Sequence, residues 1–213
     1  MYLFKKAVDI LDEANISRDD WTFGGGTSLA MRYNHRESYD IDIFIPDTQL
    51  LLFLTPRLNP NINTDYNESS NHIKLIFPEG EIDFITAPYL TNNYFKVQTI
   101  EGQNIRVETP TEVIIKKLFY RAESLKIRDI IDTAIVVEDP EVNLLAEADI
   151  LKHKLETLKW RWKSIKPYYN IEAKQLQGLN ASLENNAPKI FEKFLNQITV
   201  NRISPKGTKR PHL

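Results

Sequence analysis

A glycine turn, followed in the next predicted element by a pair of aspartates, constrains this chain more than any other feature. The turn Gly24-Gly25-Gly26 precedes two hydroxyl side chains, Thr27 and Ser28, at the start of a predicted helix. Asp40 and Asp42 then flank one isoleucine in a run typical of a strand, so both carboxylates project from one face. Two adjacent like charges are costly unless a cation neutralises them, and a divalent metal is the usual reason to tolerate the pair. The glycines let backbone N–H groups approach a phosphate, and a helix N-terminus favours negative charge. The pattern therefore predicts a nucleotidyl-transfer site.

Each half of this pattern is ordinary when it occurs alone. A glycine run is usually a loop, and two aspartates separated by one residue are usually a solvated strand edge. The order of strand, glycine turn, helix and acidic strand is much more specific. Arg36 and Ser38 add a basic group and a hydroxyl beside the carboxylates. Arg36 is expected either to contact phosphate or to form an exposed salt bridge with Glu37 or Asp40.

Two stretches of the chain carry a family resemblance. Residues 23–29, together with residues 36–44, resemble motif I of the AbiEii/AbiGii-type nucleotidyltransferase toxins, which belong to the polymerase-beta-like nucleotidyltransferase superfamily. Residues 110–118, followed by Arg121 and then by residues 128–132 (Arg-Asp-Ile-Ile-Asp), are similar to the helical segment of that family. The resemblance covers roughly residues 20–137. It implies an α+β fold, in which a polymerase-beta-like core of mixed sheet and flanking helices precedes a helical C-terminal half.

The expected reaction is attack of an acceptor hydroxyl on the α-phosphorus of an NTP, with pyrophosphate leaving. Two metals and a phosphate cradle would supply the charge neutralisation. A third carboxylate is expected from the second strand of a predicted hairpin, where Asp83 is the candidate and Glu81 the alternative. The other interpretation of this strand is a surface strand with an acidic outer face. Mg²⁺ or Mn²⁺ is the expected cofactor, and an NTP is the substrate.

A lysine pair in the predicted helix after residue 110 completes the expected site. The resemblance favours Lys117 as a triphosphate contact and Asp129 as a carboxylate facing the site. A structural salt bridge between Lys117 and the aspartates of the next helix is the alternative, and Lys116 is expected at the surface. The predicted catalytic residues are Asp40, Asp42, Asp83 and Asp129, of which the first three bind metal. The predicted NTP-binding residues are Gly25, Gly26, Thr27, Ser28, Arg36 and Lys117.

Composition excludes several other classes of protein. The 213 residues contain no cysteine, so disulfides, thiol nucleophiles and thiolate zinc sites are excluded, and the four histidines are scattered. No apolar run approaches the ~20 residues that span a bilayer, and the N-terminus does not resemble a signal peptide. We therefore expect a cytoplasmic protein with no membrane or disulfide partner.

The charge is distributed unevenly along the chain. Residues 1–150 carry 14 Lys or Arg and 25 Asp or Glu, a net charge of −11, whereas residues 151–213 carry 13 and 4, a net charge of +9. Such asymmetry suggests a nucleic-acid partner. Within residues 152–169 the aromatic side chains alternate with basic ones, and aromatics stack on unpaired bases while cations follow phosphates. The alternative is a helix with a tryptophan core and lysines outside, but Trp160 and Trp162 lie about 200° apart and cannot both face one core. The predicted RNA-binding residues are Lys159, Arg161 and Lys163.

Function and organisation follow from these observations together. The resemblance implies a toxin that transfers a nucleotide to RNA, with a tRNA end as the acceptor and a cognate antitoxin as a further partner. The alternatives are a small-molecule nucleotidyltransferase of the antibiotic-modifying type and a non-catalytic nucleotide-binding protein on the same fold. We expect a catalytic core over residues 1–108, a helical domain over 109–203 that is basic after 150, and a mobile basic tail over 204–213.

The expected elements, in chain order, are a helix over 2–15, a strand over 21–23, a helix over 27–33, a strand over 40–45, a helix over 47–55, a loop over 59–71, a hairpin of strands 72–77 and 81–86, strand structure over 95–108 with a turn at Gly102, helices from 111 and from 127 to 138, a long helix over 147–163 ended by Pro167, and a helix after Pro188.

Overall fold

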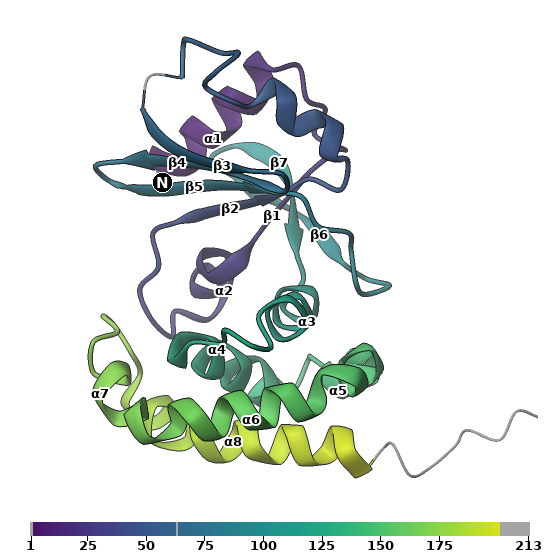
Figure 1. The fold of residues 1–213 in the computed structure, drawn as a ribbon, viewed down its shortest axis with the longest axis vertical. Coiled ribbons are helices and arrows are strands. Elements are labelled where there is room, and N and C mark those ends of the chain that lie inside the picture. The colour runs from purple at the N-terminus through teal and green to yellow at the C-terminus, as the bar shows by residue number, and fades with distance from the viewer. Residues whose placement is uncertain (1, 63, 201–213) are drawn as a thin grey trace, which may run out of the picture.

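The fold is a mixed β-sheet with helices on both faces, followed by a layer of helices (Figure 1). The computed structural model describes residues 2–62 and 64–200. Within these residues the sheet has seven strands in the order β3-β4-β5-β2-β1-β7-β6. The expected α+β fold, a mixed sheet with flanking helices followed by a helical C-terminal half, is thereby confirmed. The predicted tail 204–213 lies outside the described residues. The strands are β1 (Thr22–Gly24), β2 (Ile41–Phe44), β3 (Asp65–Ser69), β4 (His72–Phe77), β5 (Gly80–Ile85), β6 (Phe95–Ile100) and β7 (Gln103–Glu108).

The register of the central strands aligns the polar residues of the site. β2 runs antiparallel to β1 and parallel to β5, while β4 and β5 form the predicted hairpin. Asp42 pairs with Gly24 on one side and with Asp83 on the other, and Lys74 pairs with Asp83. Directly opposed residues in a sheet point to the same face. Lys74, Asp83 and Asp42 therefore form one row across three strands.

The two faces of the sheet meet different helices. Helix α1 (Tyr2–Glu13) covers the upper face in Figure 1, where Ile41 and Ile43 of β2 pack with it in one hydrophobic cluster. Helices α2 (Gly25–Tyr33) and α3 (Pro110–Tyr120) lie on the opposite face, which Asp42 shares. A second hydrophobic cluster joins Leu29 of α2 to α3 and to the helices that follow it.

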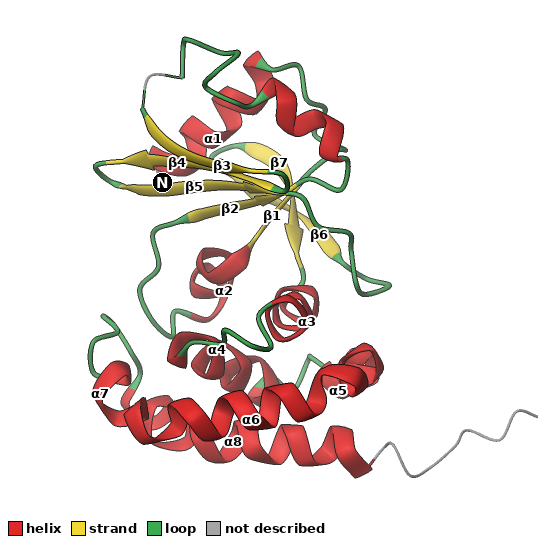
Figure 2. Ribbon diagram, in the orientation of Figure 1, coloured by secondary structure: helices red, strands yellow, loops and turns green. Residues whose placement is uncertain are grey.

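From residue 109 to residue 200 the regular structure is helical (Figure 2). Helix α4 packs closely against the long helix α8 and against α3. No helix among the described residues is long and apolar enough to cross a membrane. The remaining helices are α4 (Ile127–Glu138), α5 (Leu144–Glu147), α6 (Leu155–Ile165), α7 (Tyr169–Ala173) and α8 (Ala181–Val200), with 3₁₀ turns η1 (Thr48–Phe53), η2 (Ala148–Lys154) and η3 (Lys166–Tyr168).

Four predicted elements were wrong. The loop predicted over 59–71 contains the edge strand β3, whose side chains are all exposed. Its sequence therefore lacks the alternation of apolar and polar residues that predicts a strand. The helix predicted over 47–55 is the shorter 3₁₀ turn η1, and the long helix over 147–163 is divided into η2 and α6. Helix α8 begins before Pro188 and contains it.

The interior proline of α8 is accommodated by a side chain from α7. Proline has no N–H group, so Pro188 leaves the carbonyl of Glu184 without its helical donor. The Tyr169 hydroxyl donates to that carbonyl oxygen over 2.8 Å. The helix therefore continues through the proline with this acceptor satisfied.

Candidate active site

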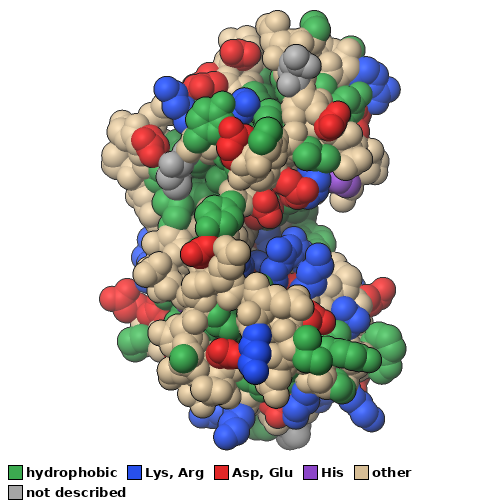
Figure 3. Space-filling view, turned by 90° about the vertical axis from the view of Figure 1, so that its left-hand side faces the viewer, with side chains coloured by type: hydrophobic (Ala, Val, Ile, Leu, Met, Phe, Trp, Pro, Cys, Tyr) green, Lys and Arg blue, Asp and Glu red, His purple; other side chains and the backbone are tan. Residues whose placement is uncertain are grey.

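A cavity of about 610 Å³ lies between the sheet and the α3–α4 region. Its sheet side is acidic and its helical side is basic. Figure 3 shows the hollow at the waist of the molecule, with red side chains above it and blue side chains below. The acidic residues that line the cavity are Asp40, Asp42, Glu81 and Asp83, with Lys74 beside them on the sheet. The basic residues that line it opposite them are Arg36, Lys116, Lys117, Arg121, Lys126 and Arg128.

Asp42 and Asp83 lie at the centre of the acidic wall, on neighbouring parallel strands. Burial, followed by the negative charge of Asp83, raises the pKa of Asp42 to about 6. Burial also raises the pKa of Asp83. Asp40 lies in the segment that enters β2, and its Oδ1 accepts a hydrogen bond from the backbone N–H of Glu81 over 3.3 Å. All three carboxylates that were predicted to bind metal line the cavity.

Gly25 makes close approach of the turn to Asp42 possible. Its φ is +72°, which L side chains rarely adopt, and a Cβ there would lie 1.7 Å from Oδ2 of Asp42. A Cβ on Gly26 would lie 2.6 Å from the Arg36 guanidinium. Both glycines line the cavity. Only a bare backbone can occupy this position between the carboxylate and the guanidinium.

The two hydroxyl residues after the turn do not line this cavity. The Thr27 hydroxyl donates to the backbone carbonyl of Asp40 and lies 3.0 Å from the Ser38 hydroxyl. It therefore ties α2 to the acidic segment, residues 35–40, which leads into β2. The Ser28 hydroxyl donates to the carbonyl of Gly25 over 3.0 Å. Both hydroxyls therefore stabilise the backbone around the turn.

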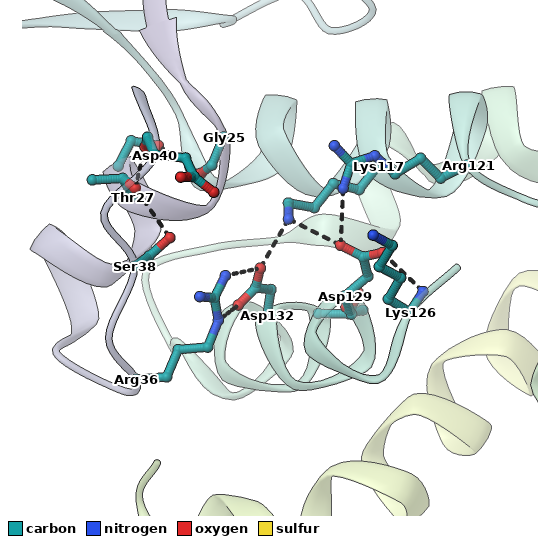
Figure 4. A network of polar contacts seen from close by, with 12 residues as sticks. Gly25, Thr27, Arg36, Ser38, Asp40, Lys117, Arg121, Lys126, Asp129 and Asp132 are labelled. Atoms are coloured by element: carbon teal, nitrogen blue, oxygen red, sulfur yellow. Dashed lines mark hydrogen bonds and ion pairs between the residues drawn. The ribbon is translucent and has the colours of Figure 1, made fainter. Parts of the chain in front are cut away.

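A buried ionic network connects the acidic segment to helices α3 and α4 (Figure 4). Arg36 donates two hydrogen bonds to Asp132, from Nε to Oδ1 over 2.7 Å and from Nη2 to Oδ2 over 2.9 Å. Lys117 donates to the same Oδ2 over 2.9 Å and to Oδ1 of Asp129 over 3.0 Å. The expected exposed salt bridge of Arg36 with Glu37 or Asp40 is wrong, because its guanidinium is buried against α4.

The two aspartates of α4 keep this network charged. Burial would raise the pKa of Asp132, but Lys117, His35 and Arg36 outweigh it and hold that pKa well below its usual range. Asp129 is fully buried; its Oδ2 accepts from the backbone N–H of Lys126. Asp129 is not among the residues that line the cavity, although it was predicted to face the site. It contacts Lys117, which does line the cavity.

Lys116 is buried, contrary to the surface position expected for it. Its Nζ lies 2.5 Å from Oε1 of Glu108 and 3.3 Å from Oε1 of Glu112, and it sits 4.1 Å from the centre of the Phe44 ring. Helix α3 packs between the sheet and the helical half, so residues on several of its sides are enclosed. Helical periodicity predicts that one side of a helix is buried, but it cannot show that a second side is buried as well.

Lys74 is a cavity residue that the sequence did not single out. Its Nζ forms a hydrogen bond with Glu81 and lies 3.2 Å from Oδ2 of Asp83. Alternation along β4 puts Lys74 on one face with His72, and both line the cavity. The sequence contains that alternation but not the register that places Lys74 beside Asp83.

The acidic wall fits a divalent cation at Asp42. Within residues 2–62 and 64–200, no group donates a hydrogen bond to its carboxylate, and the nearest strand neighbour is a second carboxylate. Oxygen ligands of this kind are preferred by Mg²⁺ and Mn²⁺. No three acidic or histidine side chains of the described residues converge in a metal-holding arrangement, since Asp83 and Glu81 are turned to Lys74. The unpartnered carboxylate is the position with room for a cation.

The predicted RNA-binding residues lie on α6, apart from the cavity lining. Lys159 pairs with Glu156 over 3.6 Å, and Lys163 is exposed. The Arg161 Nε donates to the backbone carbonyl of Leu125 over 3.0 Å, which supports the α3–α4 connection beside the cavity. Trp162 is buried and Trp160 is 64% exposed, so the two tryptophans do point to different surroundings, as expected.

A glycine turn, a row of aspartates and a basic wall surround one cavity on a mixed sheet. This fold and this site together define a protein of the nucleotidyltransferase class. The sequence matches the family described as "Nucleotidyl transferase AbiEii toxin, Type IV TA system" over residues 9–204, and the chain belongs to that family. No curated protein matches the sequence significantly.

Similar folds occur among solved structures. The nucleotidyltransferase toxin MenT4 from Mycobacterium tuberculosis is 15% identical, with a TM-score of 0.49 over 83% of this chain and 75% of that one. A candidate nucleotidyltransferase from H. pylori is 16% identical, with a TM-score of 0.48 over 92% and 95% of the two chains. The antibiotic-resistance factor ANT(2'')-Ia is 14% identical, with a TM-score of 0.45 over 94% and 95%.

Proposed function

We propose that the protein is a metal-dependent enzyme that transfers a nucleotide from an NTP to an RNA acceptor, with tRNA as the favoured acceptor. The observation that carries the proposal is the cavity itself, in which the unpartnered Asp42 beside Asp83 faces a basic wall. An NTP with its metal has the complementary charge pattern, because the triphosphate is anionic and the metal is cationic. The aspartates would hold the metal, and the basic wall would hold the phosphates.

The reaction is a substitution at phosphorus. The oxygen of the acceptor hydroxyl forms a bond to the α-phosphorus, and the bond from that phosphorus to the bridging β-phosphate oxygen breaks, so pyrophosphate leaves. The hydroxyl proton passes to a carboxylate of the acidic wall, for which we propose Asp83, since it faces the cavity and its raised pKa favours uptake of a proton. Mg²⁺ or Mn²⁺ held by Asp40 and Asp42 would neutralise the charge on the reacting phosphate.

The basic wall positions the triphosphate. Lys117 and Arg121 of α3 line the cavity. Both contact Asp129 of α4, and Lys117 also contacts Asp132 (Figure 4). Lys126 and Arg128 extend the wall at the start of α4. The backbone N–H groups of Gly25 and Gly26, at the N-terminus of α2, are the proposed cradle for the terminal phosphates. Fixed donors of this kind need little rearrangement as charge develops on the leaving group.

The proposed biological role is that of a toxin acting on RNA in the cytoplasm, countered by a cognate antitoxin. Membership of a family described as the toxin of a type IV toxin–antitoxin system supports it. The RNA would reach the cavity along the basic C-terminal half, where Lys159, Arg161 and Lys163 are the proposed contacts. A small-molecule acceptor of the aminoglycoside type is less consistent with the site, since such acceptors are cations and most charged residues of the cavity lining are basic.

The test is incubation of the protein with total tRNA, Mg²⁺ or Mn²⁺ and each α-labelled NTP in turn. Label from at least one NTP should enter RNA, with release of pyrophosphate, and the Asp42→Asn variant should transfer none. Expression of the wild type should arrest growth, and co-expression of its cognate antitoxin should relieve that arrest. Calorimetry that detects no binding of any NTP at millimolar concentration with either metal would favour the non-catalytic interpretation instead. Transfer to an aminoglycoside but not to RNA would identify the small-molecule enzyme.

A further inference from the structure

Lys74 occupies a fixed place beside the proposed metal-binding carboxylates. It is the cross-strand partner of Asp83, which is in turn the cross-strand partner of Asp42. Residues paired in this way lie about 5 Å apart along one face of a sheet. The sheet register therefore fixes the backbone of Lys74 next to Asp83, in the row formed by Lys74, Asp83 and Asp42.

The Lys74 ammonium is a full positive charge in the cavity. Its Nζ donates a hydrogen bond to Glu81 and forms an ion pair with Asp83. Its Nζ lies 3.2 Å from Oδ2 of Asp83, and its side chain is only 27% exposed. The ammonium therefore neutralises the outer end of the acidic wall without any added ion.

The three carboxylates consequently differ in what they can still bind. Asp83 is paired with Lys74, and Oδ1 of Asp40 accepts from the Glu81 backbone. Asp42 has no donor among the described residues. Lys74 thus neutralises Asp83, while the carboxylate of Asp42 remains free to bind a cation.

We propose that Lys74 supplies at Asp83 the positive charge that a second divalent cation would otherwise supply, so that the site binds a single divalent cation at Asp40 and Asp42. This inference rests on the proposed function and specifies its metal requirement. A second dication close to the Lys74 ammonium would experience strong repulsion in a partly desolvated cavity. During transfer, the ammonium would stabilise the negative charge that develops on the attacking oxygen near Asp83.

The test is to count bound Mn²⁺ by electron paramagnetic resonance, with a saturating non-hydrolysable α,β-methylene NTP analogue and the full-length chain. The wild type should bind one Mn²⁺ per chain. The Lys74→Met variant should bind two, or should bind the first about tenfold more tightly, because the competing charge is gone. Lys74→Arg keeps the charge and should bind one. Lys96→Met, which removes an exposed lysine of β6 outside the cavity, is the matched control and should also bind one.

The possible outcomes separate this inference from the proposed function. Two Mn²⁺ ions in the wild type would overturn the single-cation inference and leave the nucleotidyltransferase proposal standing. One Mn²⁺ in both the wild type and Lys74→Met, with equal affinity, would show that Lys74 has no such role. No Mn²⁺ bound even with the analogue would count against the proposed function itself. The wild-type count needs no variant, and Lys74→Gln replaces Lys74→Met if the latter does not fold.

Discussion

Asp42 combines a raised pKa with the absence of any hydrogen-bond donor among the described residues. A desolvated carboxylate without a donor lowers the stability of the folded protein, and a bound cation would offset that cost. The Asp42→Asn variant should therefore lose nucleotide transfer by about 10³-fold or more. Its thermal unfolding should occur at the same temperature as the wild type or slightly higher. Radiolabel transfer and calorimetry test the two effects, and wild-type activity in Asp42→Asn with Mg²⁺ present would contradict the metal assignment.

Glu108 gives a pH dependence that does not involve the metal site. Burial raises its pKa to about 7 from the usual 4.5, although Lys116 opposes the shift. Its Oε1 accepts from Thr22 and Lys116, but its Oε2 is buried beneath Gly24 with no partner in the part of the chain that the structure describes. The folded state therefore keeps a proton that the unfolded state has already lost.

The sign of the effect follows from proton linkage. Between about pH 4.5 and pH 7 the folded protein binds more protons at Glu108 than the unfolded chain does, so this residue lowers stability as the pH rises through that window. Glu108→Gln cannot ionise and should lack that loss of stability, while Lys116 keeps Glu112 as its partner. Urea unfolding at pH 5 and pH 7.5 measures the difference between the two proteins. An equal pH dependence in both would mean that Glu108 is ionised throughout this range.

At the residue scale, the sequence predicts positions better than partners. The aspartate pair and the glycine turn were predictable because glycine geometry and strand alternation are local properties. The partner of Arg36 was not predictable, since Asp132 is nearly a hundred residues away in the chain and only the packing of α4 brings it close. Lys74 was missed for the same reason, because sheet register is a long-range property.

At the scale of elements, the glycine turn offers a controlled experiment. Gly25 and Gly102 have similar φ values of +72° and +77°, but a Cβ on Gly25 would overlap Asp42, whereas a Cβ on Gly102 would meet nothing within 4 Å. Gly102→Ala should cost only backbone strain, about 1 to 2 kcal/mol. Gly25→Ala should cost more, about 3 kcal/mol or above, and should abolish transfer by displacing the carboxylate. Unfolding free energies and transfer rates measure both, and equal effects at the two sites would show that Gly25 serves only backbone geometry.

The elements that sequence patterns miss are those stabilised from outside. β3 exposes all of its side chains and exists because it pairs with β4. α8 continues through Pro188 because Tyr169 supplies a donor to the carbonyl that proline leaves unsatisfied. Local propensity does not include the pairing of β3 with β4 or the contact of Tyr169 with α8. It therefore predicts a loop in place of β3 and a helix that begins only after Pro188.

At the scale of the whole molecule, the helical half also holds the acidic segment in place. The connection between α7 and α8 forms two backbone hydrogen bonds with residues 35–37: Gln177 accepts from the N–H of Glu37 over 2.8 Å, and Asn180 donates to the carbonyl of His35 over 3.1 Å. Gly178 has a φ of +66°, and a Cβ there would press on Glu37. Removal of the C-terminal half would therefore disturb the approach to Asp40 as well as any RNA contact.

RNA binding has to be tested without loosening that structure. Arg161 supports the carbonyl of Leu125, so a triple substitution at Lys159, Arg161 and Lys163 would mix structural and binding effects. Lys159 and Lys163 are one helical turn apart on α6, and substitution of these two leaves Arg161 in place. If both contact phosphates, Lys159→Ala with Lys163→Ala should weaken RNA affinity and lower the steepness of its salt dependence by about 1.5 in log–log slope. NTP affinity should not change, because neither lysine lines the cavity.

The matched control is Lys189→Ala with Lys193→Ala, an exposed lysine pair of the same spacing on α8. It removes the same charge from the same helical half. RNA affinity measured at two salt concentrations separates a local effect from a general one. A loss confined to the α6 pair would identify α6 as the RNA contact, whereas equal losses in both variants would show that RNA responds only to total charge. Unchanged RNA affinity in the α6 variant would contradict the proposed contacts and make the basic half a structural feature.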